Sequence, residues 1–423
     1  MTPARPLRFG EFVVLMAMMT ATVAFSIDAM LPGMPVIGAT LSPEAPNRVQ
    51  LIVTLFMVGL GAGTLLAGPL SDRFGRKPVV VAGLAIYGAA ALAAAQAQTI
   101  EALLAARFVQ GMGAAAPRVV AIAIIRDQYS GRPMARVTSI VMTIFILVPI
   151  LAPAAGAGII ALSGWRAIFL AFVVFALVCG LWLMLRQPET LAPEARRPLR
   201  ARSLIAAVAE VVRSRRVLTY IAALSLGFGQ MLIFLSTVPQ VFADVWDRAA
   251  TMPYWFALVA VMAGVSGAVN ATLVMAQGMR RLATLAFAVQ ATVSALYLVV
   301  AGLFDLPQPY DFYLFIAYLC AAFFMIGLTF GNLNALAMEP LGHIAGTASA
   351  VIGALSTFAA AAIAIPAGLT YAGSEFTTVG GVLVCATLAF ALMLTTRDRP
   401  GAGEAVRPPR PAPQDPAPGQ RHP

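Results

Sequence analysis

Long runs of apolar residues alternate with short polar segments along the whole chain. The runs are long enough for membrane-spanning helices, which need about 20 predominantly apolar residues. They show no strict alternation of apolar and polar positions, the pattern of a strand in a membrane β-barrel. The pattern predicts an all-α integral membrane protein with twelve transmembrane helices. The predicted spans lie at residues 12–36, 49–70, 79–97, 102–124, 137–161, 166–186, 217–241, 253–276, 281–303, 312–336, 343–369 and 376–395.

The composition supports this class of protein. Only 11% of the 423 residues are charged and 60% are apolar, whereas a soluble domain carries about 25% charged residues. A soluble enzyme, a disordered chain and a nucleic-acid-binding domain therefore fit poorly. The net charge of +10 does not alter this, because basic residues concentrate in the cytoplasmic loops of membrane proteins. The three cysteines stand in apolar runs and give no sign of a disulfide framework.

The first apolar run follows Arg5 and Arg8 and could be taken for a signal peptide. Its apolar stretch is too long for that, and no small-residue cleavage site closes it before Pro32. We therefore expect an uncleaved first helix.

Arginines cluster in every second loop, whereas the intervening loops carry mainly aspartate and glutamate. By the positive-inside rule, the arginine-rich loops face the cytoplasm, which places both termini there. Two termini on one side require an even number of spans, in agreement with twelve. The arginine clusters stand at residues 5–8, 73–77, 126–136, 196–216, 280 and from 397 onward.

The polar, arginine-rich and proline-containing segment 187–216 is the only long interruption between spans. It predicts a cytoplasmic linker between two six-helix bundles, a layout of transporters built from two similar halves. The predicted organisation is a cytoplasmic N-terminus (1–9), a first bundle (10–186), the linker (187–216), a second bundle (217–396) and a proline-rich, disordered tail (397–423).

Three ionisable residues stand well inside the predicted spans: Asp28, Arg107 and Arg118. Such residues are costly in lipid and point to function. At a rise of 1.5 Å per residue, both Asp28 and Arg107 lie roughly 27 Å from the cytoplasmic face, so they can share one level. Arg118 lies on nearly the same face of its helix as Arg107, nearer the cytoplasm. A structural ion pair, a carboxylate that binds and releases protons, and an arginine that binds an anionic substrate are all compatible with this placement.

Helix-breaking and small residues concentrate in three predicted helices, where proline kinks a helix and glycine permits close packing. The fifth helix carries Pro149, Pro153, Gly156 and Gly158; the second carries Gly59, Gly61 and Gly63; the first ends with Pro32, Gly33 and Pro35.

Several motifs resemble those of the major facilitator superfamily. The segment GPLSDRFGRKP (68–78) is similar to its loop signature between helices two and three, RFVQG (107–111) to its helix-four motif, and residues 149–158 to its helix-five antiporter motif. Asp28 with Pro32 and Pro35, and the pair Arg126 and Asp127, further resemble bacterial drug:proton antiporters of the Bcr/CflA type. The resemblance covers residues 10–395. The matched loop positions are Gly68, Asp72, Arg73, Gly75, Arg76 and Lys77.

The resemblance implies the twelve-helix major facilitator fold in the inner (plasma) membrane of a bacterium. It implies that Arg107 takes part in proton coupling and that Asp28 binds protons or cationic drugs. It also implies that Asp72, Arg73 and Arg76 form a charge network that latches the two halves on the cytoplasmic side, although these arginines could serve topology alone. Further candidates for the coupling site and the substrate cavity are Arg118, Gln110, Met30 and Phe234.

The function predicted from these features is secondary active export of small amphipathic drugs or metabolites in exchange for protons, by alternating access. Apolar, adaptable side chains such as Met30 and Phe234 favour promiscuous export. The alternative is a proton-coupled or facilitated importer of one small metabolite. An integral membrane enzyme fits less well, because the chain has only two histidines and no clustered cysteine or histidine. We expect a monomer whose partners are a small-molecule substrate, protons and the lipid bilayer, with no nucleic acid, metal or cofactor.

Overall fold

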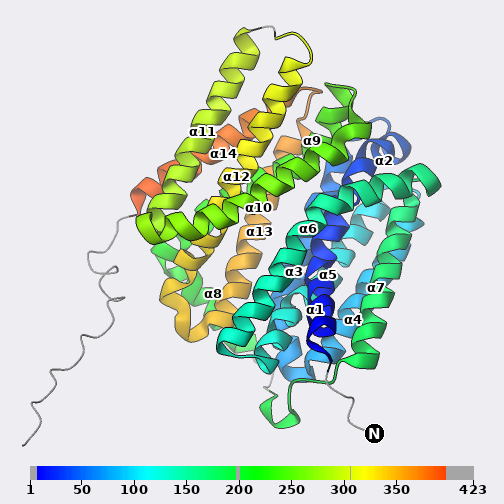
Figure 1. The fold of residues 1–423 in the computed structure, drawn as a ribbon, viewed down its shortest axis with the longest axis vertical. Helices are drawn as coiled ribbons and strands as arrows, with labels where there is room; N and C mark the ends of the chain where they lie inside the picture. The colour runs from blue at the N-terminus through cyan, green and yellow to red at the C-terminus, as the bar shows by residue number, and fades with distance from the viewer. Residues whose placement is uncertain (1–6, 197–200, 305, 397–423) are drawn as a thin grey trace, which may run out of the picture.

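The computed structural model describes residues 7–196, 201–304 and 306–396, and within these ranges the chain is helical with no β-strand. The first half of the chain forms seven α-helices and two short 3₁₀ turns (Figure 1). They are α1 (Phe9–Asp28), η1 (Leu31–Gly33), α2 (Met34–Leu41), η2 (Pro46–Gln50), α3 (Leu51–Phe74), α4 (Arg76–Ala95), α5 (Ile100–Gln128), α6 (Gly131–Ser163) and α7 (Arg166–Arg186).

The second half repeats this plan after a short connecting region. That region contains η3 (Pro193–Ala195) and α8 (Ala201–Arg213). The helices of the second half are α9 (Arg215–Asp244), η4 (Ala249–Thr251), α10 (Met252–Gln277), α11 (Met279–Leu303), α12 (Tyr310–Met338), η5 (Glu339–Ile344), α13 (Ala345–Leu369) and α14 (Glu375–Thr395).

By length and composition, eleven helical stretches of the described chain can cross a membrane. One of them, Tyr310–Leu369, is 60 residues long and contains α12, η5 and α13. The two helices are long enough to cross separately, so this stretch accounts for two crossings. The fold is therefore the predicted all-α membrane fold with twelve spans.

The first span is broken where the sequence predicts a kink. Helix α1 ends at Asp28, and η1 and α2 follow after a turn at Ala29 and Met30. Pro32 and Pro35 are the second residues of η1 and α2, within the first turn, where the missing N–H group of proline is tolerated. The break therefore places Asp28 at a helix end inside the span.

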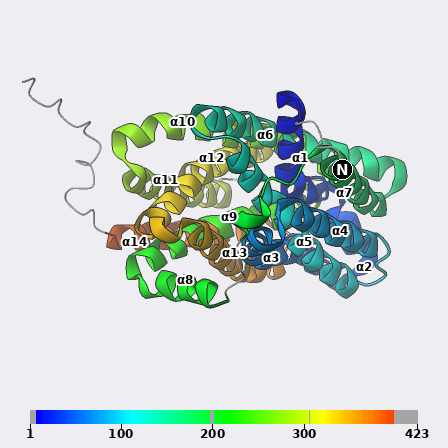
Figure 2. The same cartoon turned by 90° about the horizontal axis from the view of Figure 1, so that it is seen from below.

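Helix α8 lies within the segment that the sequence predicts as a polar linker. Its Ala207 and Val211 are buried, whereas Ile205 and Val212 are exposed. This is an amphipathic helix, which the high arginine content of the segment concealed. Figure 2 shows α8 on the outer side of the second half, beside α13, and it packs against α13 and α9. We call the end of the molecule that carries α8 the linker side and the opposite end the far side.

Helices α3 and α5 pack backbone to backbone. A Cβ atom at Gly59 would overlap the carbonyl of Phe108, and one at Gly111 would overlap the carbonyl of Phe56. The predicted close contact of the second helix is thus made through Gly59 and also through Gly63, where an added Cβ would overlap the carbonyl of Met112. Gly61, on another face of α3, instead lies near Phe358 of the second half.

Helix α6 approaches the break in the first span through Gly156. A Cβ atom there would overlap the backbone of Ala29, the residue directly after Asp28. Around Gly158, in contrast, nothing lies within 4 Å of an added Cβ. The helix-five motif therefore contains one glycine required by packing and one that is not.

Replacing Gly156 by Ala should push α6 away from α1 and destabilise the protein by about 1–3 kcal/mol, the usual cost of overpacking. The measurement is the midpoint of thermal unfolding of the purified protein in detergent. Gly158→Ala, on the same helix, is the matched control and should leave the midpoint nearly unchanged. Equal midpoints for the two variants would contradict the assigned contact.

Candidate functional site

Asp28 lies at the end of α1 and is 8% exposed. Among the described hydrogen bonds and ion pairs, none involves its carboxylate, and no arginine side chain of the described chain is paired with it. The structural ion pair between Asp28 and an arginine, one of the alternatives compatible with the sequence, is therefore not formed in this structure. A buried carboxylate without a cationic partner can be neutralised by a proton or by a cationic ligand.

Arg107 is fully buried and is held by neutral groups. Its guanidinium donates to Oε1 of Gln110 at 2.7 Å, to the carbonyl of Ser26 at 3.2 Å and to the carbonyl of Ile52 at 3.4 Å. Its Cζ atom also lies 4.3 Å from the centroid of the Phe56 ring. Ser26 stands two residues before Asp28, so Arg107 reaches the last turn of α1. This agrees with the common level of Asp28 and Arg107 expected from the helical rise.

The sequence missed two polar partners in this region. The hydroxyl of Tyr87, from α4, lies 2.6 Å from the hydroxyl of Ser26, and both side chains are buried. The Ser26 hydroxyl also lies 2.6 Å from the carbonyl of Thr22 and can donate to it. A tyrosine in an otherwise apolar run was the only available signal, and it is a weak one because tyrosine is common in membrane helices.

Two other predicted cavity residues are enclosed in the packed interior. Met30 and Phe234 are fully buried, and Phe234 packs against the rings of Tyr318 and Phe323. Arg118 is exposed, although it lies close to the face of α5 that buries Arg107. This face of α5 is therefore covered by neighbouring helices at the level of Arg107 and accessible to solvent nearer the linker side.

The loop between α3 and α4 forms a compact charge network. Arg76 donates to Oδ2 of Asp127 at 3.0 Å, to Oδ1 of Asp72 at 2.6 Å and to the hydroxyl of Ser71 at 2.8 Å. The guanidinium of Arg73 lies over the ring of Phe74. All of these groups belong to the first half of the chain. The network thus joins helices of one half, and in this conformation these contacts do not latch one half to the other.

Glu189, just after α7, completes this network and was not singled out from the sequence. Its carboxylate accepts hydrogen bonds from the backbone N–H groups of Arg76 at 2.9 Å and Lys77 at 3.0 Å. It therefore caps the first turn of α4, where a negative charge also interacts favourably with the helix dipole. Gly75 has a φ of 102°, and a Cβ atom there would lie 2.6 Å from the Glu189 carboxylate.

The second half shares two features with the loop between α3 and α4: a glycine with positive φ before the helix, and a basic side chain bonded to the end of another helix. Gly278 precedes α11 with a φ of 77°, as Gly75 precedes α4. Lys77 donates to the carbonyl of Met184 near the end of α7 at 2.7 Å. Arg280 donates to the Thr396 hydroxyl at 2.9 Å and also to the Thr396 carbonyl, at the end of α14. Lys77 and Arg280, each close to the start of its helix, therefore share one structural role: they bond to the end of the last span of their own half.

On the far side, hydrogen bonds join the two halves. Gln50, the last residue of η2, donates to the side chain of Gln240 on α9, which in turn donates to the carbonyl of Pro46 at 3.4 Å. Asn47 donates to the carbonyl of Tyr371 at 2.6 Å and to that of Leu369 at 3.3 Å. Figure 1 shows α2 beside the end of α9 at this end of the molecule. The halves are thus closed against each other here by neutral groups.

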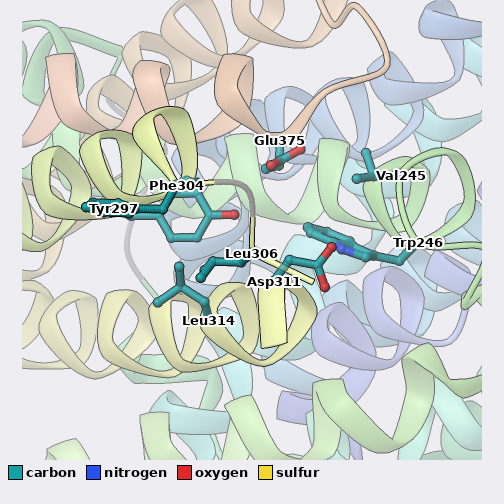
Figure 3. A pocket seen from close by; sticks show the side chains of 9 residues that line it. Val245, Trp246, Tyr297, Phe304, Leu306, Asp311, Leu314 and Glu375 are labelled. Atoms are coloured by element: carbon teal, nitrogen blue, oxygen red, sulfur yellow. The ribbon is translucent and has the colours of Figure 1, made fainter. Parts of the chain in front are cut away.

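A small cavity of about 150 Å³ opens between α9, α11, α12 and α14. Figure 3 shows the carboxylates of Asp311 and Glu375 and the rings of Trp246 and Tyr297 around it. Asp311 and Glu375 stand in the first turns of α12 and α14, where acidic residues are favoured by the helix dipole. None of the predicted site residues lines this cavity. The described residues also contain no group of histidine, cysteine, aspartate or glutamate that could hold a metal ion.

The sequence model of the Major Facilitator Superfamily matches residues 14–365, and the chain belongs to this superfamily of membrane transporters. It is thus a transporter and not an enzyme.

Curated relatives match over nearly the full chain. The chain is 28% identical over 400 residues to the "Bicyclomycin resistance protein homolog" of Haemophilus influenzae, covering 93% of this chain and 98% of the relative. It is 28% identical over 372 residues to the "Multidrug resistance protein MdtL" of Escherichia coli, covering 87% and 91%. It is also similar, at 29% identity over 359 residues, to the "Uncharacterized MFS-type transporter YdgK" of Bacillus subtilis, covering 81% and 84%.

Solved structures of transporters share the fold. The nucleoside transporter NupG superposes with a TM-score of 0.71 at 13% identity, covering 91% of this chain and 99% of that protein. A D-xylose-proton symporter superposes with a TM-score of 0.70 at 14% identity, covering 91% and 97%. Identities this low establish the common fold and nothing about the substrate.

Replacing Glu189 by Gln should destabilise the protein by about 1–3 kcal/mol, because an amide cannot accept hydrogen bonds at both of its polar atoms. One of the two N–H groups at the start of α4 would then lack its acceptor and face an NH₂ donor instead. Thermal unfolding in detergent measures the effect. Glu194→Gln, an exposed position in the same connecting segment, is the control and should behave like the wild type. If both variants unfold at the wild-type temperature, the capping role of Glu189 is wrong.

Proposed function

We propose that this protein is a proton-driven exporter of small amphipathic drugs or metabolites in the inner membrane of a bacterium, working as a monomer. The observation that carries the proposal is Asp28, a buried carboxylate at a helix break with no cationic partner. A group of this kind can exchange a proton, or bind a cationic substrate in its place, as the halves rearrange. The names of two of the curated relatives refer to drug resistance and support export over import.

The arginine distribution supports an orientation with the linker side in the cytoplasm. In that orientation the far side, closed by Gln50, Gln240 and Asn47, faces outward, and the exposed face of α5 near Arg118 opens inward. The structure then corresponds to an inward-facing state, ready to take substrate from the cytoplasm or the inner leaflet. The solved sugar and nucleoside transporters share only the fold, so they do not favour the importer alternative.

Neutralising Asp28 tests the coupling. Asp28→Asn should insert and fold, because a neutral amide is easier to bury than a carboxylate. In proteoliposomes with an imposed pH gradient, it should no longer concentrate a fluorescent amphipathic cation above its passive distribution, since nothing at that site then titrates. Glu44→Gln, an exposed acid in a far-side loop, is the control and should transport normally. Uphill transport by Asp28→Asn would show that another group carries the proton.

Weakening the far-side closure should shift the protein toward the outward-open state. Gln240→Ala removes a neutral hydrogen bond between the halves, which should raise the outward-open population by roughly two- to tenfold. Ser236 lies one turn deeper on α9 and is buried. Ser236→Cys is introduced into a variant that lacks Cys179, Cys320 and Cys385. The rate at which this cysteine reacts with an impermeant maleimide added outside then measures how often the far side opens.

Gln98→Ala is the control for this experiment, because the Gln98 side chain is exposed and bonds only to the carbonyl of Gln96 within the same half. It should leave the labelling rate unchanged. If Gln240→Ala does the same, the hydrogen bonds at Gln240 do not hold the far side closed.

A further inference from the structure

An apolar groove of about 410 Å³ runs between α8, α9 and α13. Its floor and walls are Leu218, Ile221, Ala222, Ser225 and Leu226 of α9, Leu355, Ala359 and Ile363 of α13, and Val212 of α8. None of these residues belongs to the Asp28 region, the loop network or the far-side closure.

The groove follows the helix axes. Leu218, Ala222 and Ser225 lie on one face of α9, and Leu355, Ala359 and Ile363 lie on one face of α13. At 1.5 Å per residue, these stretches are roughly 10–12 Å long. The one polar side chain, Ser225, donates its hydroxyl proton to the carbonyl of Ile221 at 2.7 Å. It therefore presents no unsatisfied group, and the groove is lined throughout by surface that suits a hydrocarbon chain.

The groove faces outward rather than toward the other half. Figure 2 shows α8 on the outer side of the second half next to α13. Val212 of α8 is 48% exposed and Leu218 of α9 is 36% exposed. At this depth the surroundings of an outward-facing apolar groove are the lipid tails of one leaflet.

Positive charge lies at the linker-side end of the groove. Arg213 directly follows Val212, and Arg215 stands three residues before Leu218 at the start of α9, on nearly the same side of that helix. Both arginines are exposed. The N-terminal end of α9, a helix of 30 residues, adds the positive end of its dipole at the same place. The groove thus combines an apolar channel with a basic entrance at the level of lipid headgroups.

We propose that this groove binds one acyl chain of an anionic phospholipid from the leaflet on the linker side, with its phosphate held by Arg213 and Arg215. Anionic headgroups are attracted to basic segments next to membrane helices. The bound lipid would join α8 to α9 and α13 and hold the amphipathic helix against the second half. The lipid site depends on the groove and its charges and not on which solute is transported or on proton coupling.

Lipid binding is tested on the purified full-length protein in detergent. Native mass spectrometry counts bound phosphatidylglycerol and, in a parallel titration, phosphatidylcholine with the same acyl chains. We expect one phosphatidylglycerol to bind preferentially and to raise the midpoint of thermal unfolding. Glycerol 3-phosphate, which lacks acyl chains, should not reproduce the stabilisation. Equal binding of the two lipids, or stabilisation by glycerol 3-phosphate alone, would overturn the proposal.

Two variants locate the site. Replacing both Arg213 and Arg215 by Gln should weaken phosphatidylglycerol binding by roughly fivefold for each arginine removed. Arg281 is an exposed arginine at the linker-side end of α11. Arg281→Gln is the charge control and should bind phosphatidylglycerol normally. Ala359→Phe should fill the groove and abolish the stabilisation, whereas Ala288→Phe, at a partly exposed position of α11, should not. Wild-type binding by both groove variants would contradict the assignment, whatever the transport assays show.

Discussion

The burial of Arg107 is the constraint on which the first half of the structure depends. A guanidinium removed from water and lipid headgroups is tolerated only where its N–H groups find acceptors. Here two of the acceptors are backbone carbonyls, of Ser26 in α1 and Ile52 in α3. Main-chain carbonyls can reach the arginine only if the helices lie unusually close, and the glycines at positions 59 and 111 permit this approach between α3 and α5.

The same arrangement determines the state of Asp28. Because neutral groups satisfy Arg107, the two buried ionisable residues share a level without pairing. The break after Asp28 brings Ala29 against Gly156 of α6. A displacement of α6 relative to α1 would therefore act directly on the backbone next to the carboxylate. This contact gives a physical route by which a change of conformation and a change of protonation at Asp28 can influence each other.

The sequence predicted the features that depend on local pattern. Apolar run length predicted the twelve spans, proline positions predicted the kink after Asp28, and helical rise predicted the common level of Asp28 and Arg107. It could not give contacts between distant segments, such as Glu189 with Lys77 or Gln50 with Gln240, because these depend on how the helices pack. Helix α8 was missed for another reason, since the arginines and prolines of the surrounding segment concealed its amphipathic period.

The contacts within the first half on the linker side and the contacts between the halves on the far side are of different kinds. On the linker side, Arg76 makes charge-assisted bonds with Asp72 and Asp127, all within the first half. On the far side, neutral amides and carbonyls join the halves. Charge-assisted bonds are roughly twice as strong as neutral ones, so the contacts that must break when the halves rock are the weaker set. The stronger set can remain intact, because it stays within one moving body and keeps that body rigid through the cycle.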